Sequence, residues 1–474
     1  MKILLVQCPC AYRVAMPSLG LAYLCSFLKE NKYEVRILDL SIILYGHVSK
    51  DNRKYWDSNN GYCWYLIDIF KNLPFLTEKV YDEFTDNILS TDSDILGFSV
   101  LNTSALFTLE IIKRIKSKKP MQKIILGGPN CYNVSNDDNN FKLPNDLQIY
   151  ADVVVIGEGE KTLLQVIDQV ENKKSLEECK GVAIPKKDKW VFTGFTEPIM
   201  NLDELPFPNF DAYDLKLYSD KNTLPILTSR GCPMRCVFCT DTYFWRLYRH
   251  RSTENVVAEI RRMQDKYKNR FFFFNDSLIN GNFVNFSDLC NMLIKEKIDI
   301  FWGGNCRIDK RLDSEFLKKM KISGCKYLIV GVESGSNKIL KLMHKGFTIE
   351  DAECFIYDCN RAGIDIMANW IVGFPGETDE DFMHTAHFIQ KNRNLIKENT
   401  FNVLALNQFS YLEKHREEFG IVLDTNHLGL WRSVDGLNNI EVRNSRLRYL
   451  ENLLEKMNKG YHIVRQIERN EKLL

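Results

Sequence analysis

Two runs of alternating strand and helix patterns, separated by a proline-containing segment, constrain the fold of this chain most strongly. Short apolar segments typical of strands begin at Lys2 and recur as far as Gly157, with helical spacing between them. A second alternation begins at Thr223 and continues to Phe409. Strands that alternate with helices form parallel sheets covered by helices, and their ligands bind beyond the carboxyl ends of the strands. The sequence therefore predicts two α/β units.

The first run predicts an amino-terminal doubly wound, Rossmann-like parallel sheet in residues 1–175. The period of the apolar residues predicts strands at 2–7, 33–40, 94–100, 123–128 and 152–157. It predicts helices at 19–30, 105–118 and 160–170. Residues 41–90 are rich in Tyr, Trp and Asn, so we expect an insertion of irregular structure and short helices. Residues 176–222 are predicted to be a connector with a small hairpin at 180–194, because three prolines follow that hairpin.

The second run predicts an open (β/α)6 partial TIM barrel in residues 223–420. Its strands are expected at 223–229, 271–275, 298–303, 327–332, 365–373 and 402–409. Its helices are expected at 253–267, 283–295, 313–322, 348–362 and 378–391. The related eightfold barrel carries its active site at the carboxyl ends of the strands. Residues 421–474 are predicted to be a helical C-terminal region, with one or two charged helices from residue 440.

Composition narrows the class of protein. The hydrophobic content of 45% and charged content of 26% are typical of a globular protein. The net charge of +1 gives no overall field that would favour nucleic acid or an anionic membrane. The sequence contains no apolar run of about 18 residues, so no membrane span is expected. Fourteen cysteines without a signal-peptide pattern indicate a reducing compartment, so we expect a cytoplasmic protein that uses cysteine for metal binding.

Three closely spaced cysteines, Cys232, Cys236 and Cys239, give the strongest functional signal. Their spacing is Cys-x3-Cys-x2-Cys, directly after the first strand of the second unit. A [4Fe–4S] cluster is ordinarily held by four thiolates, so three would leave one iron open to a small molecule. A zinc loop and scattered buried thiols are the alternatives, but zinc loops usually need a second Cys/His cluster at a readable distance, and none follows. The motif therefore favours an iron–sulfur cluster.

This cysteine run is similar to the signature of radical S-adenosylmethionine (radical SAM) enzymes. The resemblance implies that the open iron binds S-adenosylmethionine, and that reductive cleavage yields a 5′-deoxyadenosyl radical. It also implies an external electron donor of the flavodoxin or ferredoxin type. Polar and glycine residues at successive strand ends look like the cofactor contacts of the family: Phe238, Asp276, Arg307, Glu333, Ser334 and Gly373. Each also has a structural interpretation, as a cluster shield, a helix cap or a turn.

The amino-terminal unit resembles the cobalamin-binding domain found upstream of the radical SAM barrel in one large subgroup. The resemblance rests on the segments that begin at Pro17, Gly97, Leu126 and Ile156, and it implies cobalamin contacts at Ser99, Gly127, Gly128, Gly157 and Glu158. The alternative is that these glycines only make tight strand–helix turns. The loop from Cys8 to Met16 has no histidine, and His47 is the only histidine before residue 250. Any cobalamin is therefore expected to lack a histidine ligand from the protein.

Together the resemblances imply a cobalamin-dependent methyltransferase acting on an unactivated carbon, or a phosphinate phosphorus, of a small molecule or peptide. A cobalamin-dependent radical rearrangement or cyclisation is an alternative that the sequence does not separate. Where the family pattern weakens, near the sixth strand, Asn407, Gln408 and Tyr411 are candidates for substrate contact, with buried-core and turn roles as alternatives.

Two other functions are less favoured by the residues. A methylthiotransferase acting on tRNA would need three more cluster cysteines and usually a basic RNA-binding barrel at the carboxyl end. We expect most of the amino-terminal cysteines to be small buried hydrophobes instead: Cys8, Cys10, Cys25, Cys63 and Cys131. A non-catalytic cobalamin or iron–sulfur sensor would not need the polar strand ends. No DNA-binding segment is evident, and no nucleic-acid partner is expected.

Overall fold

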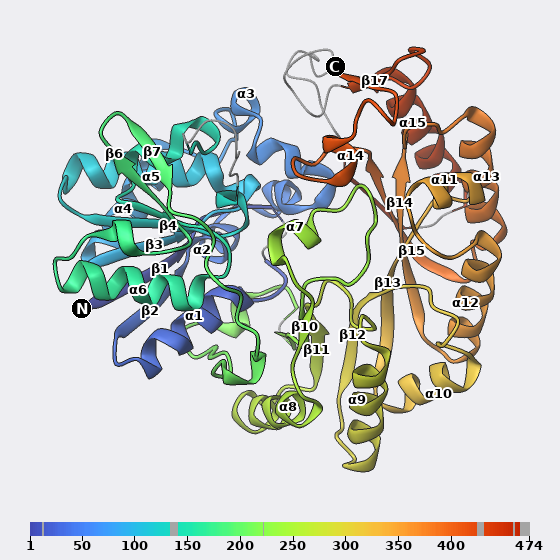
Figure 1. Cartoon of the computed structure of the whole chain (residues 1–474), viewed down its shortest axis with the longest axis horizontal. Helices are drawn as coiled ribbons and strands as arrows, with labels where there is room; N and C mark the ends of the chain where they lie inside the picture. The colour runs from blue at the N-terminus through green and yellow to red at the C-terminus, as the bar shows by residue number, and fades with distance from the viewer. Residues whose placement is uncertain (12–13, 133–140, 221, 424–430, 458–459, 465–474) are drawn as a thin grey trace. The chain divides into compact units, whose positions relative to one another are not determined.

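The computed structural model describes residues 1–11, 14–132, 141–220, 222–423, 431–457 and 460–464. The chain separates into two compact units, Met1–Lys221 and Asn222–Leu474 (Figure 1). Each unit has its own main sheet, and apolar strand residues fill the core of each. None of the helices in these ranges is both long enough and apolar enough to cross a membrane.

A seven-stranded sheet in the order β2-β1-β3-β4-β5-β6-β7 forms the first unit. Its strands are β1 (Lys2–Gln7), β2 (Glu34–Asp39), β3 (Ile95–Ser99), β4 (Lys123–Gly127), β5 (Val153–Val155), β6 (Val182–Lys186) and β7 (Lys189–Phe192). The first five run parallel, and the hairpin predicted at 180–194 adds β6 and β7 antiparallel to them. The strand order reverses between β1 and β3, which makes the carboxyl ends of these two strands a topological switch point.

Helices cover this sheet where the apolar spacing predicts them. They are α1 (Leu19–Glu30), α5 (Ala105–Lys118) and α6 (Gly159–Glu171). The predicted insertion consists of the helices α2 (Leu40–His47), α3 (Ile67–Phe70) and α4 (Glu78–Ser90) and the 3-10 segments η1 (Lys50–Trp56) and η2 (Ser58–Trp64). Its aromatic residues form a core of their own, with the rings of Trp56 and Trp64 4.9 Å apart and Trp56 stacked on Phe75.

The second unit is built on a seven-stranded parallel sheet in the order β18-β15-β14-β13-β12-β11-β8. Its strands are β8 (Thr223–Ile226), β11 (Phe271–Phe274), β12 (Phe301–Cys306), β13 (Cys325–Glu333), β14 (Asp365–Val372), β15 (Ile396–Val403) and β18 (Tyr461–Val464). Its longer helices are α8 (Thr253–Tyr267), α9 (Phe283–Lys295), α10 (Ser314–Ile322), α12 (Ile349–Arg361), α13 (Asp379–Lys391) and α15 (Ile440–Lys456). The predicted α/β fold, with an open strand–helix barrel, is confirmed.

Three details of the second unit differ from the sequence prediction. Strand β12 begins three residues late at Phe301, and β15 begins six residues early at Ile396. The apolar pattern hid the start of β15 because four polar residues follow Ile396. One of them, Asn399, is buried and accepts a hydrogen bond from Trp370 Nε1 at 2.9 Å. The C-terminal region predicted to be helical contains α15 but also the hairpin β16 (Ile421–Leu423) and β17 (Trp431–Ser433), and the strand β18. Residues 465–474 of that region lie outside the described residues.

Candidate functional site

The three motif cysteines lie on one loop, Gly231–Thr240, which we call the cysteine loop. It follows β8 and the two-residue strand β9 (Ser229–Arg230), and it leads into α7 (Asp241–Trp245). All three cysteines are partly exposed, whereas most other cysteines are buried. Gly231 begins the loop with φ +82°, and a Cβ there would lie 2.6 Å from the Leu247 carbonyl oxygen. A glycine is therefore required where the chain enters this loop.

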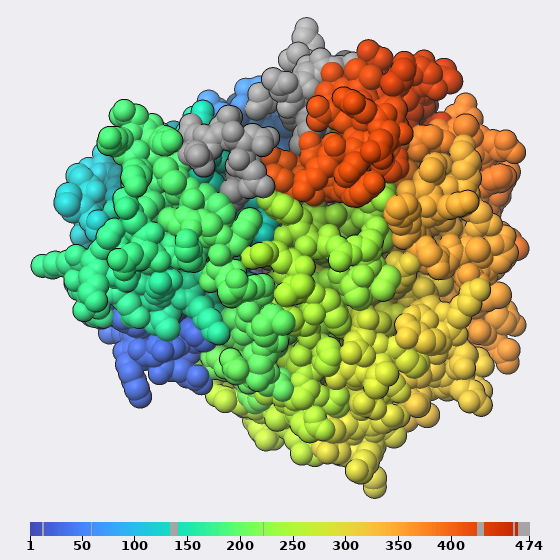
Figure 2. All heavy atoms as spheres, in the orientation of Figure 1, coloured from blue at the N-terminus to red at the C-terminus, as the bar shows by residue number. Residues whose placement is uncertain are grey.

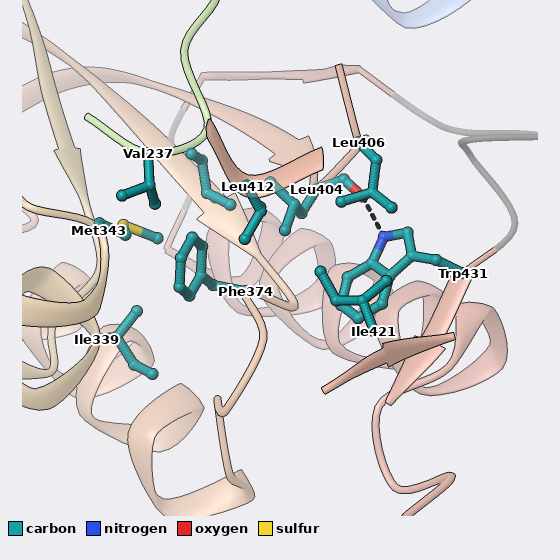
Figure 3. Packing of buried hydrophobic residues seen from close by; sticks show 10 residues of the cluster. Val237, Ile339, Met343, Phe374, Leu404, Leu406, Leu412, Ile421 and Trp431 are labelled. Atoms are coloured by element: carbon teal, nitrogen blue, oxygen red, sulfur yellow. Dashed lines mark hydrogen bonds between the residues drawn. The ribbon is translucent and has the colours of Figure 1, made fainter. Parts of the chain in front are cut away.

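Two backbone hydrogen bonds anchor the middle of the cysteine loop. The Val237 N–H donates to the Met343 carbonyl at 3.3 Å, and the Leu412 N–H donates to the Val237 carbonyl at 2.8 Å. These partners follow α11 (Asn337–Leu342) and belong to α14 (Tyr411–Lys414), respectively. The side chain of Val237 is buried in an apolar cluster that includes Phe374 and Trp431 (Figure 3). The loop is thus held by segments from distant parts of the sequence.

The C-terminal part of this apolar cluster comes from residues after β15. Leu404, Leu406, Leu412, Ile421 and Trp431 are all buried in it, and Trp431 Nε1 donates to the Leu404 carbonyl at 3.1 Å. Figure 2 shows the orange-red surface of this C-terminal part of the chain next to the yellow-green surface of the segment that follows β8. The chain after the barrel therefore excludes water from one side of the cysteine loop.

The surroundings of the cysteine loop raise the pKa of two of its thiols. Burial and the carboxylate of Asp241 raise the pKa of Cys239 to about 12, and burial also raises the pKa of Cys232. Arg307 Nη1 donates a hydrogen bond to Cys236 Sγ at 3.9 Å, so a guanidinium lies against this thiol. Within the described ranges, no three His, Cys, Asp or Glu side chains converge as ligands of a single metal ion. A [4Fe–4S] cluster needs no such convergence, because each cysteine binds a different iron.

Asp276 follows β11 and is fully buried beneath the start of the cysteine-bearing segment. Its carboxylate accepts hydrogen bonds from the Thr228 N–H at 3.2 Å, from Thr228 Oγ1 at 2.7 Å and from Ser229 Oγ at 2.5 Å. Burial raises the pKa of Asp276, while these hydrogen bonds act in the opposite direction. The contacts tie the end of β8 to the end of β11, so the carboxylate positions the segment that leads to Cys232. Its predicted contact with a cofactor stays a prediction.

Glu333 ends β13 in a strained conformation and forms a buried ion pair. Its φ is +69°, which is rare for a residue with a side chain, and the register between β13 and β14 shifts between Gly331 and Glu333. Such a bulge redirects a side chain at the end of a strand. The Glu333 Oε1 atom lies 3.1 Å from Lys345 Nζ, and both side chains are about one-tenth exposed. Sequence reasoning missed Lys345, because it follows a helix rather than a strand.

Lys345 and Arg307 bring two cations to the edge of the cysteine loop. Lys345 Nζ lies 6.0 Å from the ring centre of Phe238 and 5.6 Å from that of Phe347, and Arg307 lies 5.7 Å from the Phe347 ring centre. Phe238 itself packs against the apolar cluster, and its carbonyl accepts a hydrogen bond from Asn407 at 3.4 Å. The structure therefore brings together three of the predicted residues, Phe238, Arg307 and Glu333, and adds Lys345 to them.

Ser334 and Gly373 lie at neighbouring strand ends but have different surroundings. Ser334 is buried, and its hydroxyl accepts from the Ser336 N–H at 3.2 Å and lies 3.4 Å from Thr385 Oγ1. These contacts fix the beginning of α11. They account for a buried serine at this position even if it contacts no cofactor. Gly373 has φ +80° and follows β14; its N–H donates to Glu377 Oε2 at 2.8 Å. Contact of either residue with a cofactor stays a prediction.

All three candidate substrate residues after β15 are exposed. Asn407 and Gln408 are exposed, and the half-exposed ring of Tyr411 stacks on His415 with centres 3.8 Å apart. Phe409 between them has φ +71° and stacks on Tyr243 of α7 with ring centres 4.3 Å apart. An aromatic pair thus joins the segment after β15 to the helix after the cysteine loop.

In the first unit, the predicted ligand residues lie at the carboxyl ends of adjacent strands. Ser99 ends β3, Gly127 ends β4, and Gly157 and Glu158 lie between β5 and α6. Gly128 has φ +99°, and a Cβ there would lie 2.9 Å from the Val100 nitrogen, so close backbone packing alone requires this glycine. Gly157 also has positive φ, but its Cβ position meets only Tyr132 at 3.8 Å. Gly157 is therefore the better candidate for the approach of a large ligand.

The amino-terminal cysteines are buried, as expected for small apolar side chains. Cys8, Cys10, Cys25, Cys63 and Cys131 are all below one-tenth exposure, and burial raises the pKa of Cys8 to about 12. His47 is exposed at the end of α2. Residues 12–13 of the first strand–helix loop lie outside the described residues.

Comparison with known proteins identifies a domain in the second unit. Residues 226–389 match the model of the radical SAM superfamily. The second unit therefore contains a radical SAM domain. The matched residues contain the cysteine loop and each of the strand ends from β11 to β14. The radical SAM family that the sequence resembles is therefore confirmed.

Relatives of this radical SAM chain extend beyond the matched domain. An uncharacterized methyltransferase of Pyrococcus horikoshii is 26% identical over 82% of this chain and 78% of its own length. The anaerobic magnesium-protoporphyrin IX monomethyl ester cyclase of Rubrivivax gelatinosus is 28% identical over 64% of this chain, which spans 55% of that enzyme. Among solved structures, the radical SAM methyltransferase TsrM from Kitasatospora setae has a TM-score of 0.66 and 19% identity, covering 90% of this chain and 79% of TsrM. The two-unit fold is thus shared with radical SAM proteins.

Proposed function

We propose that this radical SAM enzyme is a cobalamin-dependent methyltransferase that acts on an unactivated carbon, or a phosphinate phosphorus, of a small molecule or peptide. The single observation that carries the proposal is the cysteine loop, which follows β8 and lies beside Arg307, Glu333 and Lys345. The radical SAM model covers this loop, and TsrM, a methyltransferase described with cobalamin and a [4Fe–4S] cluster bound, shares the fold over 90% of this chain.

The residues of the second unit fit an iron–sulfur cluster and S-adenosylmethionine. Cys232, Cys236 and Cys239 would supply three thiolates, which leaves one iron for the cosubstrate. The cations Arg307 and Lys345 suit its carboxylate, and Glu333 suits its amino group. The bound cofactors supply the radical and methyl-carrying chemistry. The chain positions the reacting groups and, through the apolar cluster around Val237, excludes water from one side of the loop.

The residues of the first unit fit cobalamin at the carboxyl ends of β3, β4 and β5, next to the switch point between β1 and β3. Ser99, Gly127 and Gly157 leave these three adjacent strand ends without large side chains, so that the backbone can approach a large ligand. No histidine lies at these ends, so the cobalamin would have no imidazole ligand from this unit. An external one-electron donor of the flavodoxin or ferredoxin type completes the proposal.

A cobalamin-dependent cyclisation is the second candidate, because a cyclase is among the relatives at 28% identity. The test is anaerobic reconstitution followed by iron, sulfide and cobalamin analysis and by mass spectrometry of the products. We expect about four irons per chain, 5′-deoxyadenosine after reduction, and loss of iron in the Cys236→Ala variant. The matched control is Cys354→Ala, which changes an exposed cysteine elsewhere. Zinc in place of iron, or full iron retention in Cys236→Ala, would contradict the proposal.

A further inference from the structure

The turn that follows β14, Gly373–Glu377, is held by hydrogen bonds and packing from residues between β17 and the middle of α15. We call it the β14 turn. Asn438 Nδ2 donates to the carbonyls of Gly373 at 3.2 Å and Phe374 at 3.1 Å. A Cβ at Gly373 would overlap the aliphatic stem of Arg443, so this stem packs directly on the glycine. The N–H and both carbonyls at the start of the turn therefore have partners, and one face of Gly373 is covered.

The side chains that hold the β14 turn are buried and are themselves held by hydrogen bonds. Arg443 is fully buried, donates to the Trp431 carbonyl at 2.7 Å and to Asn438 Oδ1 at 3.3 Å, and lies 4.1 Å above the Trp431 ring centre. Arg446 Nη1 donates to Glu377 Oε2 at 2.7 Å, the same oxygen that accepts from the Gly373 N–H. Asn438 is only 3% exposed. The two helical arginines and the asparagine thus form one network that ends on the turn.

Such a network of buried polar groups has a high desolvation cost if it serves only to cover the sheet. Burying a guanidinium carries a desolvation cost that a well-packed apolar residue avoids, so buried charges are weak evidence for stability and better evidence for a specified geometry. The geometry specified here is the backbone of Gly373, which the radical SAM match includes, whereas Asn438 and Arg443 lie outside the matched residues 226–389. This part of the chain therefore supports the end of β14 from outside the matched domain.

We propose that Asn438 and Arg443 are positioning residues for S-adenosylmethionine. They hold Gly373 and Phe374 in the backbone conformation that receives the cosubstrate, and they act through the β14 turn rather than by touching the ligand. The inference rests on the proposed function, because it takes S-adenosylmethionine as the ligand of this strand end. It assigns a part of cosubstrate affinity to the segment between β17 and α15.

The test compares two neighbouring asparagines with different tasks. Asn438→Ala removes both donors to the turn, whereas Asn439→Ala removes the cap of α15, which accepts from the Val442 N–H at 3.0 Å, without touching the turn. Both variants and the unaltered protein are reconstituted anaerobically and kept unreduced, so that no turnover occurs. Their iron content, their thermal midpoint and the Kd for S-adenosylmethionine by calorimetry are then measured.

We expect unchanged iron in both variants and comparable decreases of the midpoint. The Kd should rise about tenfold in Asn438→Ala, because two buried carbonyls lose their donor, and less than about twofold in Asn439→Ala. An equal rise in both, or no rise in Asn438→Ala, would overturn the inference. Failure of the unaltered reconstituted protein to bind S-adenosylmethionine would instead overturn the proposed function.

A second pair of variants decides the question if Asn438→Ala does not fold. Arg443→Met keeps an apolar stem against Gly373 but removes the donors to Trp431 and Asn438, and Arg448→Met changes an exposed arginine of the same helix. We expect a weaker Kd for S-adenosylmethionine in Arg443→Met only. Equal affinity in these two variants would overturn the inference.

Discussion

Removal of the Asp276 carboxylate should weaken the attachment of the cysteine loop to the sheet. The main effect should therefore be on iron retention rather than on S-adenosylmethionine binding. Asp276→Ala leaves the Thr228 N–H and the hydroxyls of Thr228 and Ser229 without their acceptor in a fully buried place. A buried donor without a partner costs about 1–3 kcal/mol, and the hydroxyls can rotate toward other acceptors. We therefore expect a cost of about 3 kcal/mol, concentrated at the strand end three residues before Cys232.

The Asp276→Asn variant separates charge from geometry. Burial raises the pKa of Asp276, so its ionised form is disfavoured in the folded chain. A raised pKa means that this group opposes folding increasingly as the pH rises through its folded value. The neutral amide avoids that cost, keeps one acceptor and can donate to a hydroxyl. We expect Asp276→Asn to cost about 1 kcal/mol at neutral pH.

The assay follows iron release from anaerobically reconstituted protein in the presence of a chelator, together with the Kd for S-adenosylmethionine. Iron should leave the Asp276→Ala variant at least about tenfold faster, which corresponds to about 1.4 kcal/mol, with Asp276→Asn in between. The exposed Asp288 of α9 provides the control, as Asp288→Ala. Normal iron retention combined with weakened S-adenosylmethionine binding in Asp276→Ala would refute this reasoning, and it would support direct cofactor contact instead.

Two further predictions concern Asp381 and Lys345. Burial alone would raise the pKa of Asp381, but hydrogen bonds from Lys338, Thr378 and Ser336 hold it below its ordinary value. Asp381→Asn should therefore lower the thermal midpoint by roughly 3–6 °C at pH 7, and the difference should shrink as the pH falls below about 4; a constant difference would contradict this. Lys345→Met should weaken S-adenosylmethionine binding about tenfold without iron loss, whereas the exposed control Lys341→Met should match the unaltered protein in calorimetry.

Apolar periodicity predicted the helices and most strands because burial decides them. Helix α8 begins and ends at the predicted residues, and its cap, Ser252, accepts from the Asn255 N–H at 3.2 Å. Strand β15 could not be predicted in this way, since buried Asn399 takes a place that an apolar residue usually holds. Strand β18 is four residues long and gains its stability from pairing with β15, a contact distant in sequence.

The candidate site was predictable where chemistry is local in sequence and not where it depends on tertiary contacts. The cysteine spacing placed three thiols on one loop, and the strand ends placed Arg307 and Glu333 near it. Lys345 could not be found in this way, because it reaches Glu333 from the loop after α11. Asp276 is the opposite case, since its position at a strand end suggested a ligand whereas the structure gives it three donors from the protein.

Two residues near the site carry a side chain where the backbone would prefer glycine. Glu333 and Phe409 have φ of +69° and +71°, which costs about 1–2 kcal/mol each relative to glycine. Glycine would remove the strain, so a side chain at these places indicates that the side chain is used. For Glu333 the use is the pair with Lys345, and for Phe409 it is the stack on Tyr243 beside the cysteine loop. Phe409→Gly should therefore relieve strain yet loosen α7, which hydrogen exchange of its amides would detect; unchanged exchange would argue that Phe409 serves only the turn.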